Sequence, residues 1–395
     1  MKKGVLILII LSIFLTGCWN RRELNELAIT LAIGIDKSDE GYLVSAQVVV
    51  PTEVSMNSGK GNSPVTLIQG EGDTVYDAIR KMTKVSPRKM YPGHLRILVI
   101  SESVAKEGIS EPLDFISRDW ELRSDFYIVV AKDARAEEVL NVQTPLENIP
   151  ANKMFNTLKQ AEENWAATVG VTLDEIIVDL ESVGKEAVLT GILVKGDLET
   201  GSNKENLTTI IPAAKIQYDG LAVFKDDKLV GWLSPEESRG YNGVIGKVKN
   251  TVSSISCPQE GKATIEILRY KSDVKGKVIN GTPKVDISVH LEANIGSIEC
   301  PIDITKAESI RALEKIHEKE VKESITQSIT SVQEKYESDI FGFGNAIHRS
   351  NPREWKTMKK QWDQYFADLE VNVKVDTRIL KTGAVNKSVL DKSED

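Results

Sequence analysis

The chain has 395 residues, of which 41% are hydrophobic and 27% are charged, and its formal net charge is −8 at pH 7. These values are ordinary for a globular protein, exclude a wholly disordered chain, and allow two or three domains of about 100–200 residues each. A net negative surface is repelled by nucleic acid and by anionic lipid headgroups, so we expect no nucleic-acid partner.

The amino end predicts a secretory signal. Lys2 and Lys3 precede an apolar run from Val5 to Leu15, which is shorter than the ~18 residues that a permanent membrane helix needs. The run ends in Leu15-Thr16-Gly17-Cys18 and resembles a bacterial lipoprotein signal. The resemblance implies removal of residues 1–17, a diacylglyceryl group on the Cys18 sulfur and an acyl group on its amino nitrogen. The alternative is an ordinary signal peptide in which Cys18 is incidental.

Loss of the leader would lower the net charge to −10, so residence at a membrane would depend on the lipid. Each buried CH₂ of an acyl chain contributes ~0.8 kcal/mol, and two chains hold a protein stably. No later segment is apolar for long enough to cross the bilayer. About ten residues separate Cys18 from the first predicted strand near Ala28, so we expect the folded body to lie close to the membrane.

Strands and helices alternate through residues 18–195, which predicts a mixed α/β domain. A helix begins at Thr74 and stops before Pro87, and another opens with the capping box Thr172-x-x-Glu175. The predicted strands are 28–35, 42–50, 65–69, 95–100, 126–131 and 187–195, and the other helices are 111–118, 133–140 and 151–165.

A polar stretch at 196–206 predicts a domain boundary. Residues 207–250 then read as a small ββα domain with a hairpin at 214–233. Its helix begins at Ser234 as N-cap, with Pro235 at the first helical position and Glu237 at the third.

Residues 251–383 predict a C-terminal domain with an antiparallel sheet and long helices. Strands are expected at 263–270, 283–292 and 295–304, because apolar and polar residues alternate there. Thr305-x-x-Glu308 predicts a capping box that opens the longest helix. A final strand is expected at 371–379, and residues 384–395 form a loose tail. The predicted fold class is therefore α+β or mixed α/β, with three domains of mixed or antiparallel sheets, flanking helices and one long C-terminal helix.

Two cysteines remain besides Cys18, and each is followed by proline. If the chain is exported, Cys257 and Cys300 can form a disulfide. The alternative is two buried thiols on neighbouring strands, because sequence does not supply the separation of the Cα atoms.

Enzyme signatures are missing from the sequence. It contains no His-Glu-x-x-His, Gly-x-Ser-x-Gly, Gly-x-Gly-x-x-Gly or Cys-x-x-Cys motif, and Gly240–Lys247 has the wrong spacing for a phosphate loop. No pair among its four histidines has zinc spacing, and His317 lies on the apolar stripe of the long helix, where a core role is the simpler explanation. Trp355 and Trp362 have the spacing of core residues. We therefore predict no enzyme activity, metal or cofactor.

Several segments together resemble the C-subunit lipoproteins of bacterial spore germinant receptors, the GerA-type C protein or Ger(x)C family. The resemblance covers nearly the whole mature chain and is most specific at Asp339-Ile-Phe-Gly-Phe-Gly344, followed by Pro352, Trp355, Trp362 and Phe366. Further segments are 18–28, 33–36, 94–101, 114–119, 131–134 and 221–233. Residues 119–123 depart from the family pattern.

The resemblance implies three α/β domains on the outer face of the spore's inner membrane. It also implies a complex with two integral-membrane subunits, of the A and B types, which responds to nutrients, and it offers no catalytic residues. The predicted function is a non-catalytic, lipid-anchored receptor subunit that stabilises or couples the membrane subunits. The alternative is a lipid-anchored solute-binding protein that captures a nutrient itself.

Overall fold

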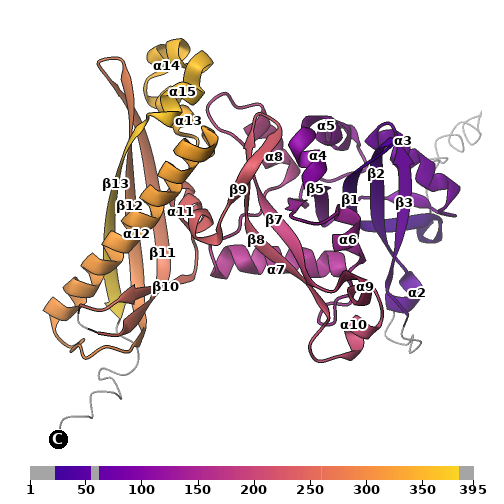
Figure 1. Cartoon of the computed structure of the whole chain (residues 1–395), viewed down its shortest axis with the longest axis horizontal. Coiled ribbons are helices and arrows are strands. Elements are labelled where there is room, and N and C mark those ends of the chain that lie inside the picture. Colours follow the sequence, from indigo (N-terminus) through magenta and orange to yellow (C-terminus); the bar gives the residue numbers. More distant parts are fainter. Residues whose placement is uncertain (1–22, 55–61, 259, 382–395) are drawn as a thin grey trace, which may run out of the picture.

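The computed structural model describes residues 23–54, 62–258 and 260–381. The predicted leader 1–17, the predicted lipidation site Cys18 and the predicted tail 384–395 lie outside these residues. Within them the chain forms two mixed sheets with flanking helices, one of which, α12 (Ala307–Tyr336), is much longer than the others (Figure 1). The predicted mixed α/β class with a long C-terminal helix is confirmed.

The first sheet is built around parallel strands that helices cover on both faces. Its order is β3-β2-β1-β5-β6-β7-β8-β9, with the short strand β4 paired to the start of β1. The strands from β1 through β5 and β6 to β7 are parallel, and antiparallel hairpins extend both edges. Every residue of β5 is buried, as expected for a central parallel strand. The bounds are β1 Leu27–Ser38, β2 Gly41–Val49, β3 Val65–Gly72, β4 Lys89–Tyr91, β5 Ile97–Ser101, β6 Tyr127–Ala131, β7 Val188–Gly196, β8 Ala214–Lys225 and β9 Lys228–Leu233.

Two apolar clusters lie on opposite faces of this sheet. The helices α3 (Val75–Lys81), α4 (Glu102–Glu107), α5 (Ser110–Arg118) and α8 (Leu173–Leu180) pack into one cluster. On the other face lie α6 (Ala136–Asn141) and α7 (Pro150–Asn164). Thr74 caps α3 and the predicted box Thr172-x-x-Glu175 caps α8, which confirms both sequence-based assignments. The short elements η1 (Leu24–Glu26), α2 (Pro51–Val54) and η2 (Met82–Lys84) lie in connections.

The middle hairpin differs from the sequence-based expectation. β8 pairs with β7 along most of its length, so the hairpin continues the first sheet, whereas the sequence predicts a separate domain at 207–250. The polar stretch 196–206 carries the short helices α9 (Leu198–Gly201) and α10 (Glu205–Thr208) and connects two neighbouring strands. A polar surface connection has the same composition within a domain as between domains, and pairing with a distant strand leaves no local signal.

The second sheet has the order β10-β11-β12-β13, with bounds β10 Thr251–Ser256, β11 Lys262–Ile279, β12 Thr282–Ile298 and β13 Glu370–Lys381. The strands predicted at 283–292 and 295–304 were wrong as separate elements, because β12 runs without a break from Thr282 to Ile298. The sheet is also not purely antiparallel, since β13 pairs parallel to β12. The alternating pattern shows which side chains face inward but not the direction of the neighbouring strand.

The long helix α12 packs across the second sheet with Leu313, Ile325, Ile329 and Val332 buried. Its predicted capping box is wrong. The N-cap is Lys306, and the hydroxyl and backbone N–H of Thr305 donate to the carboxylate of Asp303. Thr305 therefore bonds to the nearby carboxylate of Asp303 and does not serve as the N-cap that the sequence pattern predicts.

Candidate functional sites: the joint at Asp339 and a cavity under α3

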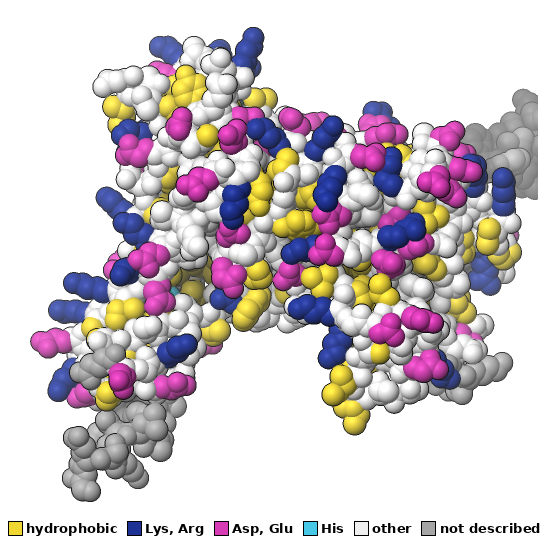
Figure 2. Space-filling model, viewed as in Figure 1, with side chains coloured by type: hydrophobic (Ala, Val, Ile, Leu, Met, Phe, Trp, Pro, Cys, Tyr) yellow, Lys and Arg dark blue, Asp and Glu magenta, His cyan; other side chains and the backbone are white. Residues whose placement is uncertain are grey.

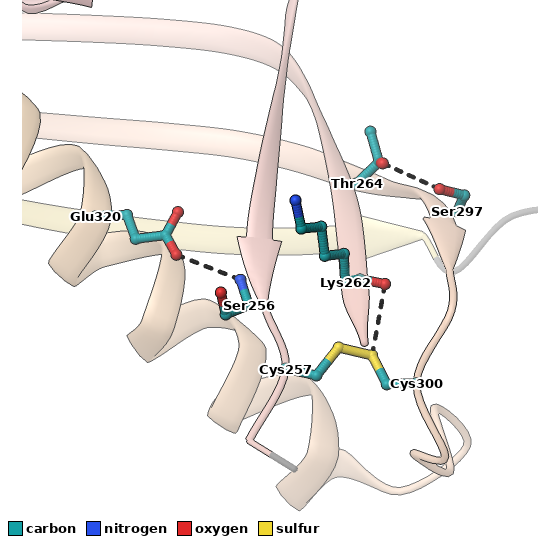
Figure 3. The surroundings of a disulfide bond; sticks show 7 residues. All are labelled: Ser256, Cys257, Lys262, Thr264, Ser297, Cys300 and Glu320. Atoms are coloured by element: carbon teal, nitrogen blue, oxygen red, sulfur yellow. Dashed lines mark hydrogen bonds between the residues drawn. A yellow bond between two sulfur atoms is a disulfide. The ribbon is translucent and has the colours of Figure 1, made fainter. Parts of the chain in front are cut away.

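Of the residues singled out in the sequence, two cysteines meet. Cys257 follows β10, Cys300 follows β12, and the structure joins them as a disulfide with Cα atoms 6.3 Å apart (Figure 3). The pair closes the end of the second sheet beside the buried side chains of Ala263, Ile295 and Leu313. Because the disulfide joins the ends of two segments that flank β10–β12 and lies beside a buried apolar cluster, we regard it as structural. That it forms in the cell stays a proposal.

The segment after α12 joins the two sheets. Here the chain turns at Glu337 and enters α13 (Phe343–Ser350). The hydroxyl of Ser338 donates to the carbonyl of Phe224 in β8 at 2.6 Å. The backbone N–H of Glu186, just before β7, donates to the carbonyl of Asp339 at 2.9 Å. The segment that leads into the C-terminal helices is therefore bonded directly to β8 and to the residue before β7 in the first sheet.

Asp339 organises this joint. Its carboxylate accepts the N–H groups of Phe343 and Gly344 at 3.0 and 2.7 Å, and the indole N–H of Trp362 at 2.8 Å. The first two belong to the unsatisfied donors at the start of α13, so the charge also faces the positive end of a helix. Burial raises the pKa of Asp339 to about 6, against the lowering effect of these donors. Because the carboxylate is buried and both of its oxygens accept hydrogen bonds from the protein, we regard it as structural.

Glycine lets the two parts approach closely here. A Cβ on Gly344 would lie 2.7 Å from the Cα atom of Gly184 and 2.7 Å from the ring of Trp355. Gly342 has a φ of +74°, which side chains strongly disfavour. The most specific family segment, 339–344, is therefore explained by packing and capping. The short helices α14 (Pro352–Met358) and α15 (Trp362–Ala367), with η3 (Lys359–Gln361) between them, bury both tryptophans, as the sequence predicts.

A second contact joins α11 (Pro235–Ile245) to α12. Glu237 is the third residue of the predicted capping box at Ser234, which the structure confirms. The same carboxylate accepts from the hydroxyl of Ser331 and from the ammonium of Lys335, the latter at 3.0 Å. Hydrogen bonds from Ser331 and Ser234 and the charge of Lys335 outweigh burial and lower the pKa of Glu237 to about 2. The sequence predicted the cap but gave no signal for the bridge to α12.

A cavity with a largely apolar lining lies under α3 and α5, beside β1 and β2, with a volume of about 540 Å³. Ile33, Val44 and Met82 form part of its apolar wall. Arg80 and Trp120 are exposed members of its lining. The volume lies in the range of small-molecule sites. The sequence did not predict this cavity, because its walls come from distant segments.

The described residues bring no cluster of metal-ligating side chains together. No group of three or more His, Cys, Asp or Glu side chains within them could hold a metal ion. The cavity lining contains no His, Cys or Ser. His317 is buried and donates or accepts one hydrogen bond with Thr377, and burial lowers its pKa to about 4, so it is a neutral core residue. His290 and His348 lie apart, beside Asp376 and Trp355.

Two family models match consecutive parts of the chain. Residues 20–194 match the family described as "Spore germination protein N-terminal domain", and residues 219–383 match "Spore germination B3/ GerAC like, C-terminal". Together these matches identify a spore germination protein.

The relatives are similar over nearly their whole length. The chain is 32% identical to spore germination protein KC of Bacillus subtilis, over 98% of each chain, and 24% identical to spore germination protein B3 of the same organism, over 94% of this chain and 96% of that one. The crystal structure of the GerBC protein superposes with a TM-score of 0.55 at 19% identity, covering 88% of this chain and 96% of that one. The chain belongs to the Ger(x)C family of spore germination proteins.

No helix among the described residues is long and apolar enough to cross a membrane. Cys18, on which the predicted membrane attachment depends, precedes the first described residue by five positions.

Proposed function

We propose that this protein is a non-catalytic, lipid-anchored subunit of a nutrient germinant receptor, held by Cys18 on the outer face of the spore's inner membrane. Its work is to assemble with, or couple, integral-membrane subunits of the A and B types. The observation that carries the proposal is full-length similarity to spore germination proteins in a chain whose Cys18 follows a lipoprotein-type leader. The joint at Asp339 supports it, because a coupling subunit needs its two sheets fixed to each other.

The anchor is tested with Cys18→Ala. Spores that carry this variant should lose the nutrient response that depends on this receptor, because the negatively charged protein does not stay at a bilayer without its acyl chains. Germination is followed with nutrient, together with an immunoblot of the spore membrane fraction. A normal nutrient response in spores that contain the variant contradicts the proposal.

The partners are tested by affinity purification from spore inner membranes, with mass spectrometric identification of the proteins that accompany the chain. The tip between α10 and β8 is the place where we expect contact, since Ile210 is fully exposed and Ile211 is 77% exposed. Figure 2 shows hydrophobic side chains at the end of this projection. Exposed apolar side chains that stand together mark interaction sites more often than single ones.

The double variant Ile210→Ser/Ile211→Ser should recover less of the A- and B-type subunits while the chain remains folded. Ile279→Ser is the control, because Ile279 is also an exposed hydrophobic residue but ends β11 in the second sheet, away from this tip. Recovery that is equal in both variants removes this tip from the interface.

Direct capture of a nutrient is the second candidate function, and the cavity under α3 is the feature that favours it. Calorimetric titration of the protein with amino acids and sugars separates the two. Saturable heat that Met82→Trp abolishes supports solute capture, whereas no heat supports the coupling subunit.

A further inference from the structure

The chain carries a basic segment against its overall charge. Between Asp77 and Glu102 there are six Lys or Arg residues and no Asp or Glu, in a chain whose formal net charge is −8. Five of the six lie within Arg80–Lys89, around η2 and β4. Such a cluster attracts anionic surfaces within about one Debye length, even when the molecule as a whole is negative.

This segment lies beside the amino end of the described chain. β4 pairs parallel to the start of β1, so that Lys89 lies opposite Leu27, four residues after the first described residue, Glu23. Cys18 precedes Glu23 by five residues, which span at most about 18 Å when fully extended. Any membrane that holds Cys18 is therefore within short reach of the basic segment.

Large apolar side chains are exposed among these charges. Trp120 is 80% exposed and Val85 is 68% exposed. Lys89 forms an ion pair with Glu121, the neighbour of Trp120, which brings the tryptophan next to the basic segment. Figure 2 shows dark blue, magenta and yellow side chains intermixed at the end of the molecule where α3 lies. Tryptophan beside Lys and Arg is the composition of a membrane–water interface.

Some basic side chains of this segment form no ion pair with neighbouring described residues and are free to bind an anionic surface. Lys81 pairs with Asp77 on α3. In the adjoining loop Asp114 pairs with Arg118, Asp125 with Arg123 and Glu121 with Lys89, which leaves Asp119 as the acidic residue there that forms no ion pair with a described residue. The guanidinium of Arg80 donates to the hydroxyl of Tyr76. Lys84 and Arg88 are exposed, and neither forms an ion pair with any other described residue.

We propose that Arg80, Lys84, Val85, Arg88, Lys89 and Trp120, here called the basic face, rest on the anionic headgroups of the membrane in which Cys18 is anchored. The proposal depends on the proposed anchorage and adds an orientation: the lipid holds the chain, and the basic face selects which end turns toward the bilayer. Arg80, Lys89 and Trp120 also line the cavity under α3. The cavity then opens toward the membrane, which makes capture of a solute from the medium less favourable.

The test uses the full-length, processed protein reconstituted into vesicles of phosphatidylcholine, with or without one quarter phosphatidylglycerol. Amide hydrogen exchange is followed in peptides that cover residues 80–91 and 119–123. We expect exchange in Thr83–Lys89 to slow about tenfold with phosphatidylglycerol, and the effect to disappear in 0.5 M salt. Flotation with pure phosphatidylcholine vesicles reports the anchor separately, so loss of anchorage and loss of orientation are distinct results.

Lys84→Glu/Arg88→Glu should abolish this protection without detaching the protein. Lys356→Glu/Lys360→Glu is the matched control, because both lysines are exposed at the same spacing and the change in charge is the same. Floated protein that shows no protection overturns the proposal. Protection of equal size on pure phosphatidylcholine overturns it too, as does protection that appears only after membrane subunits are added, which makes the face a protein contact.

Discussion

Asp339 shows how one residue can help to hold two sheets together. Its carboxylate is fully buried, yet three N–H groups from two helices point at it, and its own carbonyl accepts from Glu186 beside the first sheet. A buried charge of this kind is tolerated only while its partners are in place.

Asp339→Asn should lower the free energy of unfolding by about 2–4 kcal/mol, because one side-chain NH₂ group would then face an N–H donor. Urea unfolding followed by tryptophan fluorescence measures this. Asp363→Asn is the control: Asp363 pairs with Lys225 at a half-exposed position, and the loss there should not exceed about 1 kcal/mol. Equal losses in the two variants would mean that Asp339 does not hold the joint.

His317 gives the stability a pH dependence of known sign. Burial lowers its pKa in the folded state to about 4, below the usual 6.5, so its neutral form is the folded one. The contribution of neutral His317 to the free energy of unfolding is fully present above pH 6.5. It is lost as the pH falls toward 4, by up to roughly 3 kcal/mol. Asp339 acts in the opposite direction. Its pKa is raised to about 6 in the folded state, so the folded protein binds a proton more readily than the unfolded chain and the free energy of unfolding rises as the pH falls below 6.

His317→Leu therefore isolates the histidine. The difference in unfolding free energy between wild type and variant should fall between pH 7 and pH 4, measured by urea unfolding at each pH. A difference that stays constant over this range rules out a neutral buried His317.

At the scale of elements, α11 and α12 depend on Glu237. Glu237→Gln should lower the free energy of unfolding by about 1–2 kcal/mol, because Ser331 and Lys335 then donate to a neutral amide oxygen and the charge assistance of both bonds is lost. Glu236→Gln is the matched control, since Glu236 is exposed and neighbours Glu237 in the same helix turn. Thermal unfolding of both variants is compared with wild type, and an equal effect of the two would contradict the bridge.

The disulfide is the second prediction at this scale. Cys257 and Cys300 are 43 residues apart, so closing this loop is worth about 4 kcal/mol on chain entropy. Reduction by dithiothreitol should lower the unfolding temperature of wild type and leave Cys257→Ser/Cys300→Ser unchanged. Identical responses of both proteins would show that the two thiols are free.

Local patterns predicted most elements, and contacts between distant segments account for the errors. Ser234 and Thr172 cap helices as their patterns predict, because those signals need only three following residues. Thr305 fails because Asp303, two residues earlier, accepts its hydroxyl. The parallel direction of β13, the pairing of β8 with β7, and the cavity under α3 depend on partners tens of residues away. Asp339 carried a readable signal, an acidic residue before a glycine-rich helix start, but its bond to Trp362 did not.

At the scale of the whole molecule, charge and anchorage point to one orientation. The chain is negative overall, and its basic face lies beside the amino end, where Cys18 would enter the membrane. The joint at Asp339 and the bridge at Glu237 fix the position of the second sheet relative to the first. The second sheet lies at the other end of the molecule (Figure 1). A rigid body held at one end suits a subunit that couples others.

Membrane attachment at Cys18 is the claim on which this account depends, and intact-mass and peptide analysis of the protein from spore membranes tests it directly. The account predicts a chain that begins at Cys18 and carries a diacylglyceryl thioether on its sulfur. A free thiol at Cys18, or residues 1–17 still attached, would contradict the account.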